Sequence, residues 1–99
     1  MIQAQIFIDK DEIYQDKLLY NFIMEFLLHQ DISGATAFNG FMGFGANQQL
    51  KQPNRLFSFD EEPMLITFID DDAKVLKALK ELRTLTKAGY IVTNPVEVH

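Results

Sequence analysis

Residues 35–56 read ATAFNGFMGFGANQQLKQPNRL, and the interpretation of the 99-residue chain is built outward from this stretch. Residues 35–44 predict a strand, with alternate side chains on opposite faces of a sheet. Glycines stand at positions 40, 43 and 45. Glycine within a strand is typical of a bend, a bulge, or close approach by another backbone or a ligand. We therefore expect the chain to bend here, beside a place where a ligand or partner binds.

The same glycines can be compared with a phosphate-binding loop. Their order, Gly-x-x-Gly-x-Gly, is superficially similar, but the Gly-Lys-Ser/Thr ending is absent and no helix pattern follows. Without a helix N-terminus the usual anion site is missing, so a strand bend is the favoured interpretation. The polar residues 46–54, ANQQLKQPN, predict a long connection, which is either a functional loop or a solvated link between two strands.

Regular elements are predicted on both sides of this stretch. Alternating apolar residues predict a strand over residues 1–9. Apolar residues three and four apart predict a helix from Asp16 to about residue 30, with Asp16 capping its first turn. Gly34 is expected to end this helical region with a positive φ. Residues 64–70, MLITFID, predict a central strand that is covered on both faces.

The remaining elements complete a recognisable order. A short strand is predicted over residues 56–59 and a turn over residues 60–63. A second amphipathic helix follows over residues 73–88, and a final strand, interrupted at Asn94-Pro95, over residues 90–98. Gly89 is expected just beyond the second helix. Strand, helix, strand, strand, helix, strand predicts one α+β domain over residues 1–99 with the ferredoxin-like βαββαβ fold, an antiparallel sheet with two helices on one face. The other face would be bare in a monomer, which favours a homo-oligomer.

Clustered acids and the histidines show no pattern of metal binding or catalysis. Residues 9–12 are interpreted as a solvated turn, and residues 70–72 as N-cap and dipole partners of the second helix, because neither run has the spaced ligands of a calcium loop. For His29, in the last turn of the first helix, a structural role is favoured over acid–base catalysis. With no Cys, no Ser/His/Asp set and no His pair, we expect no catalytic residues, metal or cofactor.

The composition excludes several classes of partner. A net charge of −5 argues against non-specific nucleic-acid binding and against attraction to anionic membrane surfaces. The sequence has neither the pattern of a signal peptide nor an apolar run near the roughly 20 residues of a membrane span. We therefore expect a cytoplasmic protein without membrane insertion, which the absence of Cys also fits.

The glycine run also carries a resemblance to a known family. Residues 34–45, GATAFNGFMGFG, resemble the Gly-Ala-Thr-Val-x-Arg-Gly-x-x-Gly-Phe-Gly signature of the PII-like proteins of unknown function, the family numbered 190. Leu19-Tyr20, residues 60–69 and residues 96–98 are similar to the same family, so that the resemblance covers nearly the whole chain. Asn39 stands where the family has a basic residue.

The resemblance implies a trimer whose sheets face inward, with a loop after the second strand comparable to the T-loop of PII proteins. In PII proteins nucleotides bind in clefts between subunits, and the loop docks on transporters or enzymes. By analogy this chain would be a regulator that binds a nucleotide or small metabolite and signals through residues 45–56. The basic turn that PII proteins carry after their second helix has no counterpart here. The candidate ligand positions are Gly40, Gly43, Gly45, Asn47, Gln48, Lys51 and Arg55.

Two other functions stay open at this point. Paired ferredoxin-like sheets also form small dimeric α+β barrel enzymes, such as cofactor-free monooxygenases, and the Phe and Met content permits an apolar pocket of that kind. A passive structural oligomer with no ligand is the third reading. A fold alone does not choose among them, because one fold hosts many functions.

Overall fold

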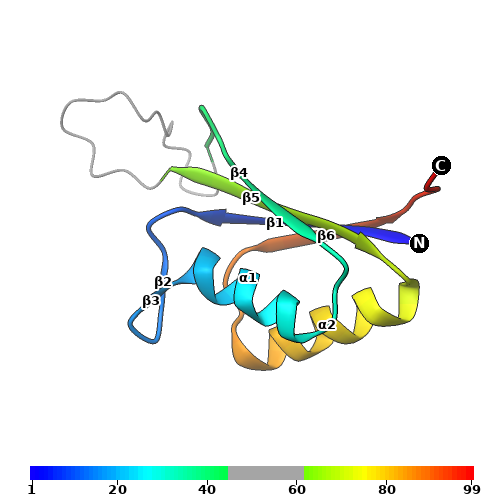
Figure 1. Ribbon diagram of the computed structural model, residues 1–99. Coiled ribbons are helices and arrows are strands. Elements are labelled where there is room, and N and C mark those ends of the chain that lie inside the picture. The colour runs from blue at the N-terminus through cyan, green and yellow to red at the C-terminus, as the bar shows by residue number, and fades with distance from the viewer. Residues whose placement is uncertain (45–61) are drawn as a thin grey trace.

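The computed structural model describes residues 1–44 and 62–99. An antiparallel sheet of four strands in the order β4-β5-β1-β6 carries two helices on one face (Figure 1). The sheet strands are β1 Ile2–Asp9, β4 Ala35–Asn39, β5 Pro63–Asp70 and β6 Tyr90–Pro95. The helices are α1 Leu19–His29 and α2 Asp72–Leu85, and a small hairpin is formed by β2 Ile13–Tyr14 and β3 Lys17–Leu18. The α+β ferredoxin-like arrangement expected from the sequence is confirmed.

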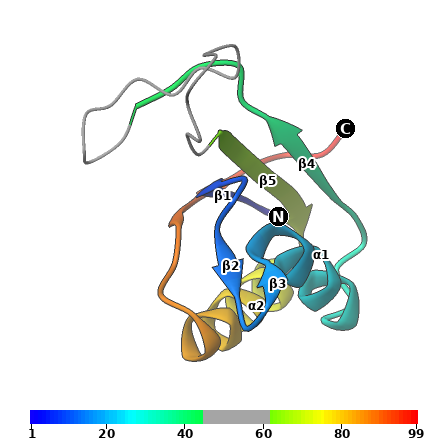
Figure 2. The ribbon, with the colours of Figure 1, turned by 90° about the vertical axis from the view of Figure 1, so that its left-hand side faces the viewer.

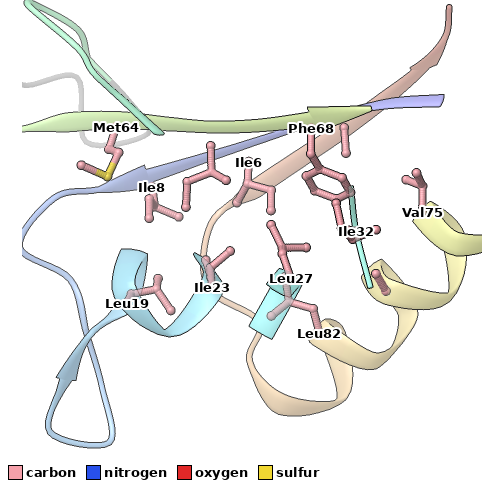
Figure 3. Close-up of a cluster of buried hydrophobic side chains, with 13 residues drawn as sticks. Ile6, Ile8, Leu19, Ile23, Leu27, Ile32, Met64, Phe68, Val75 and Leu82 are labelled. Carbon is pink, nitrogen blue, oxygen red and sulfur yellow. The ribbon is translucent and has the colours of Figure 1, made fainter. Parts of the chain in front are cut away.

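The core lies between the sheet and the helices (Figure 3). One apolar stripe on each helix faces the sheet because its residues recur at three and four positions. The fully buried residues of α1 are Leu19, Ile23 and Leu27, and those of α2 are Val75, Ala78 and Leu82. On the sheet they meet the alternate residues of β1 and β5, which are Ala4, Ile6, Ile8, Met64, Ile66 and Phe68.

The opposite face of the sheet has no covering layer among the described residues. The sequence predicted that residues 64–70 would be covered on both sides, but the helices cover one side only. Leu65 and Thr67 are half-buried on the other side, and Ile69 is 38% exposed. The apolar composition of this strand therefore exceeds what residues 1–44 and 62–99 bury.

The first helix begins later than predicted. Gln15 and Asp16 both have positive φ, 47° and 66°, and form the two-residue turn of the β2–β3 hairpin. Asp16 therefore turns the hairpin and does not cap α1, whose N-cap residue is Leu18. The hairpin lies beside α1 (Figure 2), with the Tyr14 ring centroid 4.2 Å from that of Phe22.

The end of α1 also differs from the prediction. Asp31, with φ of 59°, takes the left-handed position that was expected of Gly34. The N–H of Asp31 donates to the carbonyl of Leu28, and the N–H of Ile32 donates to that of Leu27, both at 3.3 Å. This is the pairing of a Schellman motif, and the buried Ile32 supplies its apolar contact with Leu27.

The region around α2 and β6 needs three smaller corrections. The helix ends at Leu85, so Gly89 is not its terminating residue; with φ of +81° it leads into β6. An added Cβ there would lie 2.8 Å from Cγ2 of Ile8, which leaves no room for a side chain beside β1. β6 is continuous to Pro95, and residues 96–98 are not a strand. The short strand predicted over residues 56–59 lies outside the described residues.

Candidate functional site

One end of the sheet gathers the described part of the candidate site. Here β4 ends, β5 begins, β1 ends and β6 begins, as the pairs Asn39–Met64, Ile8–Met64 and Phe7–Tyr90 show. We call this the glycine end of the sheet, defined by Gly40, Gly43, Pro63, Lys10 and Gly89. It lies away from the two chain termini (Figure 1).

Gly40 continues the pairing of β4 with β5 beyond the last residue of the strand. Its N–H donates to the carbonyl of Pro63 at 2.6 Å. A Cβ added at Gly40 would lie 2.6 Å from Cγ and 3.0 Å from the carbonyl oxygen of Pro63, whereas one added at Gly43 would be 3.5 Å from Cγ. Close approach of two backbones, one of the causes that the sequence suggested, is therefore found at Gly40. Ligand contact by either glycine stays a prediction.

Substitution of Gly40 is expected to weaken the fold where substitution of Gly43 does not. Gly40→Ala forces the rigid ring and carbonyl of Pro63 to move, which should lower the free energy of unfolding by about 1–3 kcal/mol. Gly43→Ala is the matched control, expected within about 0.5 kcal/mol of the parent. Urea unfolding of both variants measures the free energy of unfolding. If the two variants lost the same amount, the contact with Pro63 would not be the reason that position 40 requires glycine.

The other candidate positions, Gly45, Asn47, Gln48, Lys51 and Arg55, lie outside the described residues. The chain enters this region through a run of exposed apolar side chains that sequence reasoning did not single out. Phe38, Phe41, Met42 and Phe44 are 54%, 70%, 50% and 72% exposed. Phe38, Phe41 and Phe44 stand three residues apart in the sequence, which could have indicated an exposed apolar run. The sequence analysis interpreted them only as alternating residues of a strand.

Two basic residues at the glycine end were also missed, and each already binds within the chain. The backbone N–H of Lys10 donates to the carbonyl of Glu62 at 2.7 Å, and its Nζ lies 3.4 Å from Oε2 of the same residue. The guanidinium of Arg83 donates to the carbonyls of Ala88 and Gly89 at 2.7 and 3.1 Å. Lys10 therefore fixes the start of β5, and Arg83 fixes the connection from α2 to β6.

The acidic run 70–72 lies at the other end of β5. Asp71 and Asp72 take the predicted N-cap and first-turn positions of α2, but Asp70 acts differently from the prediction. Asp71 is the N-cap residue of α2 but makes no side-chain capping bond. The carboxylate of Asp70, only 4% exposed, accepts instead from the backbone N–H and Oγ of Ser33 at 2.9 and 3.0 Å and from the N–H of Asp71 at 2.7 Å. Nζ of Lys74 lies 3.2 Å away.

These donors stabilise the ionised form of Asp70. The backbone bond from Ser33 contributes most, and together with the bonds from Asp71 and Lys74 it outweighs burial and lowers the pKa of Asp70 to about 2. Asp70 therefore ties the start of α2 to the segment before β4. No group of acidic or histidine side chains suited to a metal ion occurs in residues 1–44 and 62–99.

Comparison with known proteins places this geometry in a family. The family model DUF190, described as Uncharacterized ACR, COG1993, matches residues 1–98. The chain belongs to this family. A UPF0166 protein of Aquifex aeolicus (strain VF5) is 27% identical over 95 residues, covering 95% of this chain and 89% of that protein. The resemblance drawn from the glycine run is thus confirmed.

Solved structures show the same fold. CPII, a nitrogen regulatory PII-like protein from Thiomonas intermedia K12, bound to ADP, AMP and bicarbonate, superposes with a TM-score of 0.65. It is 13% identical, and the match covers 98% of this chain and 86% of CPII. CPII bound to ADP, AMP and acetate gives a TM-score of 0.66 at 14% identity, over 99% and 87%. At this identity the comparison shows that the DUF190 chain has a PII-like fold.

The helices were also compared with the requirements of a membrane. Neither α1 nor α2, nor any other helix within the described ranges, is long and apolar enough to span a bilayer.

Proposed function

We propose that this DUF190 protein is a PII-like regulator that binds a small ligand in clefts between the subunits of a homotrimer and signals through residues 45–56. The observation that carries the proposal is the match to CPII over 98% of the chain. The family signature of this chain lies in and after β4, where the sheet leads into the connection. In this proposal the protein acts in the cytoplasm on a transporter or an enzyme, and catalyses no reaction.

The open face of the sheet supports the oligomer. Four residues, one from each strand, form a row across it: Phe38, Leu65, Phe7 and Tyr90. In this apolar row, Phe38, Phe7 and Tyr90 are 54%, 43% and 70% exposed. Contiguous apolar surface of this kind is typical of an interaction site. A trimer with inward-facing sheets would bury the apolar row and stabilise a small domain.

A nucleotide is the first ligand to test, because ADP and AMP are bound to CPII. Lys10 and Arg83 are not proposed as contacts, since each already binds within the chain. The proposed contacts are those of the sequence prediction: Gly40, Gly43, Gly45, Asn47, Gln48, Lys51 and Arg55.

The test combines the mass in solution with ligand-induced thermal stabilisation. Light scattering should give the mass of three chains. ADP or AMP at about 100 times its Kd should raise Tm by at least about 5 °C, since ligand binding to the native state alone contributes about 2.7 kcal/mol there. The double variant Lys51→Ala/Arg55→Ala should reduce this rise while keeping the Tm of the free protein.

Other outcomes would redirect the proposal. A mass of two chains would favour the paired-sheet barrel enzyme instead. A passive structural oligomer would be supported by two results together. Neither ADP, AMP nor a metabolite panel would change the Tm of the trimer, and Lys51→Ala/Arg55→Ala would leave every measurable interaction of the protein unchanged.

A further inference from the structure

The segment from the start of α2 to residue 87 concentrates the positive charge of the chain. Five of the nine Lys and Arg residues stand in α2 or in the two residues after it. They are Lys74, Lys77, Lys80, Arg83 and Lys87. Residues 72–87 contain only two acids, Asp72 and Glu81, so this span has a formal charge of +3, whereas the whole chain has −5. The span is thus a basic segment of an acidic protein.

Two of the five basic side chains are already bound within the chain. Nζ of Lys74 lies 3.2 Å from Oδ2 of Asp70, and Arg83 donates to two backbone carbonyls. The other three are exposed and make no hydrogen bond or ion pair within residues 1–44 and 62–99: Lys77, Lys80 and Lys87. Their charge therefore stays available to a partner.

The acids of the span do not neutralise these lysines. Glu81 stands four residues after Lys77, a spacing that allows an ion pair on a helix. Oε2 of Glu81 instead accepts from Nε2 of Gln30, just after α1, at 2.6 Å. Asp72 lies 3.0 Å from the amino group of Met1. A solvated helix typically carries charges of both signs that pair along its surface, and α2 differs from that pattern.

Two of these lysines share one side of α2 with an exposed leucine. Because an α-helix has 3.6 residues per turn, Leu76, Lys77 and Lys80 lie within about 100° of one another, opposite the buried Val75 and Leu82. Leu76 is 54% exposed. We call Leu76, Lys77 and Lys80 the lysine face. It combines positive charge with an apolar contact point.

We propose that the lysine face is a docking surface for a single acidic peptide segment of a partner protein. The carboxylates of that segment pair with Lys77 and Lys80, and an apolar side chain covers Leu76. The lysine face belongs to the helical layer, on the other side of the sheet from the apolar row (Figure 1). The inference goes beyond the proposed function, because it depends neither on a nucleotide, nor on residues 45–56, nor on the number of chains.

The width of the basic surface favours a single segment over a broad anionic surface. α1, which lies beside α2 on the same face of the sheet, has no Lys or Arg. Its one acid, Glu25, is paired with Lys17 of the hairpin, and the exposed Asp31 follows the helix. The basic surface is thus one helix wide, about 10 Å. A flat anionic membrane would find no positive charge on α1 to extend the contact.

The acids elsewhere in the chain limit the attraction to short range. At 0.15 M salt, exposed charges more than about 8 Å apart are largely screened from one another. An acidic segment therefore interacts mainly with the lysines that it contacts, and not with the net charge of −5. Binding should weaken as the salt concentration rises, since exposed ion pairs are themselves screened.

Fluorescence anisotropy with a defined peptide tests the docking surface. The probe is a labelled peptide of about 12 residues with the repeat Glu-Glu-Leu-Ala, which as a helix is long enough to span the lysine face. It should bind saturably at 0.15 M NaCl, and the same peptide with Gln in place of Glu should bind about 10-fold more weakly.

Substitution of the two lysines should weaken binding without weakening the fold. Lys77→Gln/Lys80→Gln should lower the affinity for the Glu peptide about 10-fold, the loss expected for two exposed ion pairs. The Tm should stay that of the parent, because neither side chain is bonded within the described parts of the chain. Leu76→Gln should lower the affinity about threefold with no change of charge, because it removes the apolar contact.

A control variant makes the same change of net charge elsewhere. Gln15→Glu/Lys17→Gln alters two exposed residues of the β2–β3 turn and strand. Its affinity for the Glu peptide should stay within about twofold of the parent, because distant charges are screened.

The outcomes decide the inference separately from the proposed function. Absence of saturable binding, or equal losses in the two double variants, would overturn it. If phosphatidylserine vesicles bound through Lys77 and Lys80 while the Glu peptide did not bind, the partner would be a membrane and the inference would be wrong. Lys77→Gln/Lys80→Gln should keep the parent mass and the rise of Tm with ADP or AMP. Failure of those two parent measurements, with the Glu peptide still bound by the lysine face, would contradict the proposed function alone.

Discussion

Replacement of Asp70 by asparagine is expected to lower the free energy of unfolding by about 3 kcal/mol. The carboxylate accepts bonds from Ser33 N–H, Ser33 Oγ and Asp71 N–H, and it pairs with Lys74. An amide removes the charge and turns an N–H₂ group toward one set of these donors. Buried donors then lose their acceptor, which costs about 1–3 kcal/mol for each group left unpaired.

The neighbouring position gives a matched control for this prediction. Asp71 is exposed and makes no side-chain capping bond, so Asp71→Asn should change the free energy of unfolding by less than about 0.5 kcal/mol. Urea unfolding at pH 7 and fixed protein concentration compares the two variants. If both variants lost the same free energy of unfolding, the negative charge near the start of α2 would account for the effect, and the hydrogen bonds made by Asp70 would not.

Acid titration gives Asp70→Asn a second readout. Because the pKa of Asp70 falls from 3.8 in the unfolded chain to about 2 in the folded one, its contribution is fully present above pH 3.8 and is lost as the pH falls toward 2. This contribution amounts to at most about 2 kcal/mol. The parent protein should lose most of it between about pH 4 and pH 2, and Asp70→Asn should lack this step.

Phe7→Glu is expected to convert the oligomer into monomers. Phe7 lies within the apolar row on the open face, and a carboxylate there would be desolvated without a partner on association. We expect association to weaken at least about 100-fold, since a loss of 2.7 kcal/mol corresponds to that factor. Phe7 is 43% exposed in the single chain, so the monomer should keep its fold by circular dichroism.

An exposed leucine on the helical layer gives the control for the open face. Leu28, in α1, is 71% exposed and does not belong to the sheet. Leu28→Glu should keep the parent mass by light scattering. Retention of the oligomer in Phe7→Glu would show that the interface does not depend on the apolar row, and loss of the oligomer in Leu28→Glu would place the interface on the helical layer.

Much of the fold could be predicted from the sequence because apolar spacing marks the buried side of each long element. The local endings could not be predicted in the same way. Gln15 and Asp16 adopt left-handed backbone without the Asn-Gly signal of a tight hairpin, and Asp31 ends α1 although Gly34 is the better residue for that position. In both places the chain packs against α1, through Tyr14 of the hairpin and through the buried Ile32, and a local sequence pattern does not reveal such packing.

The sequence predicted where in the chain the candidate site lies, but not the contacts that its residues make. A strand bend was the favoured interpretation of the glycine run and close approach was an alternative; Gly40 shows close approach, against Pro63. The role of Asp70 was hidden because its main donor, Ser33, is 37 residues earlier in the chain. A local pattern can suggest an N-cap, but a bond between distant segments depends on the assembled sheet.

The pairing of Gly40 with Pro63 has a consequence for how the architecture can diversify. The chain leaves the sheet beside the point where it returns, and Lys10 holds the returning residue Glu62 in place. Whatever length or chemistry joins these two fastened points, the strands behind them keep the same register. The length and chemistry of the intervening piece can therefore vary at little cost to the scaffold, because the bonds that hold the register lie outside that piece.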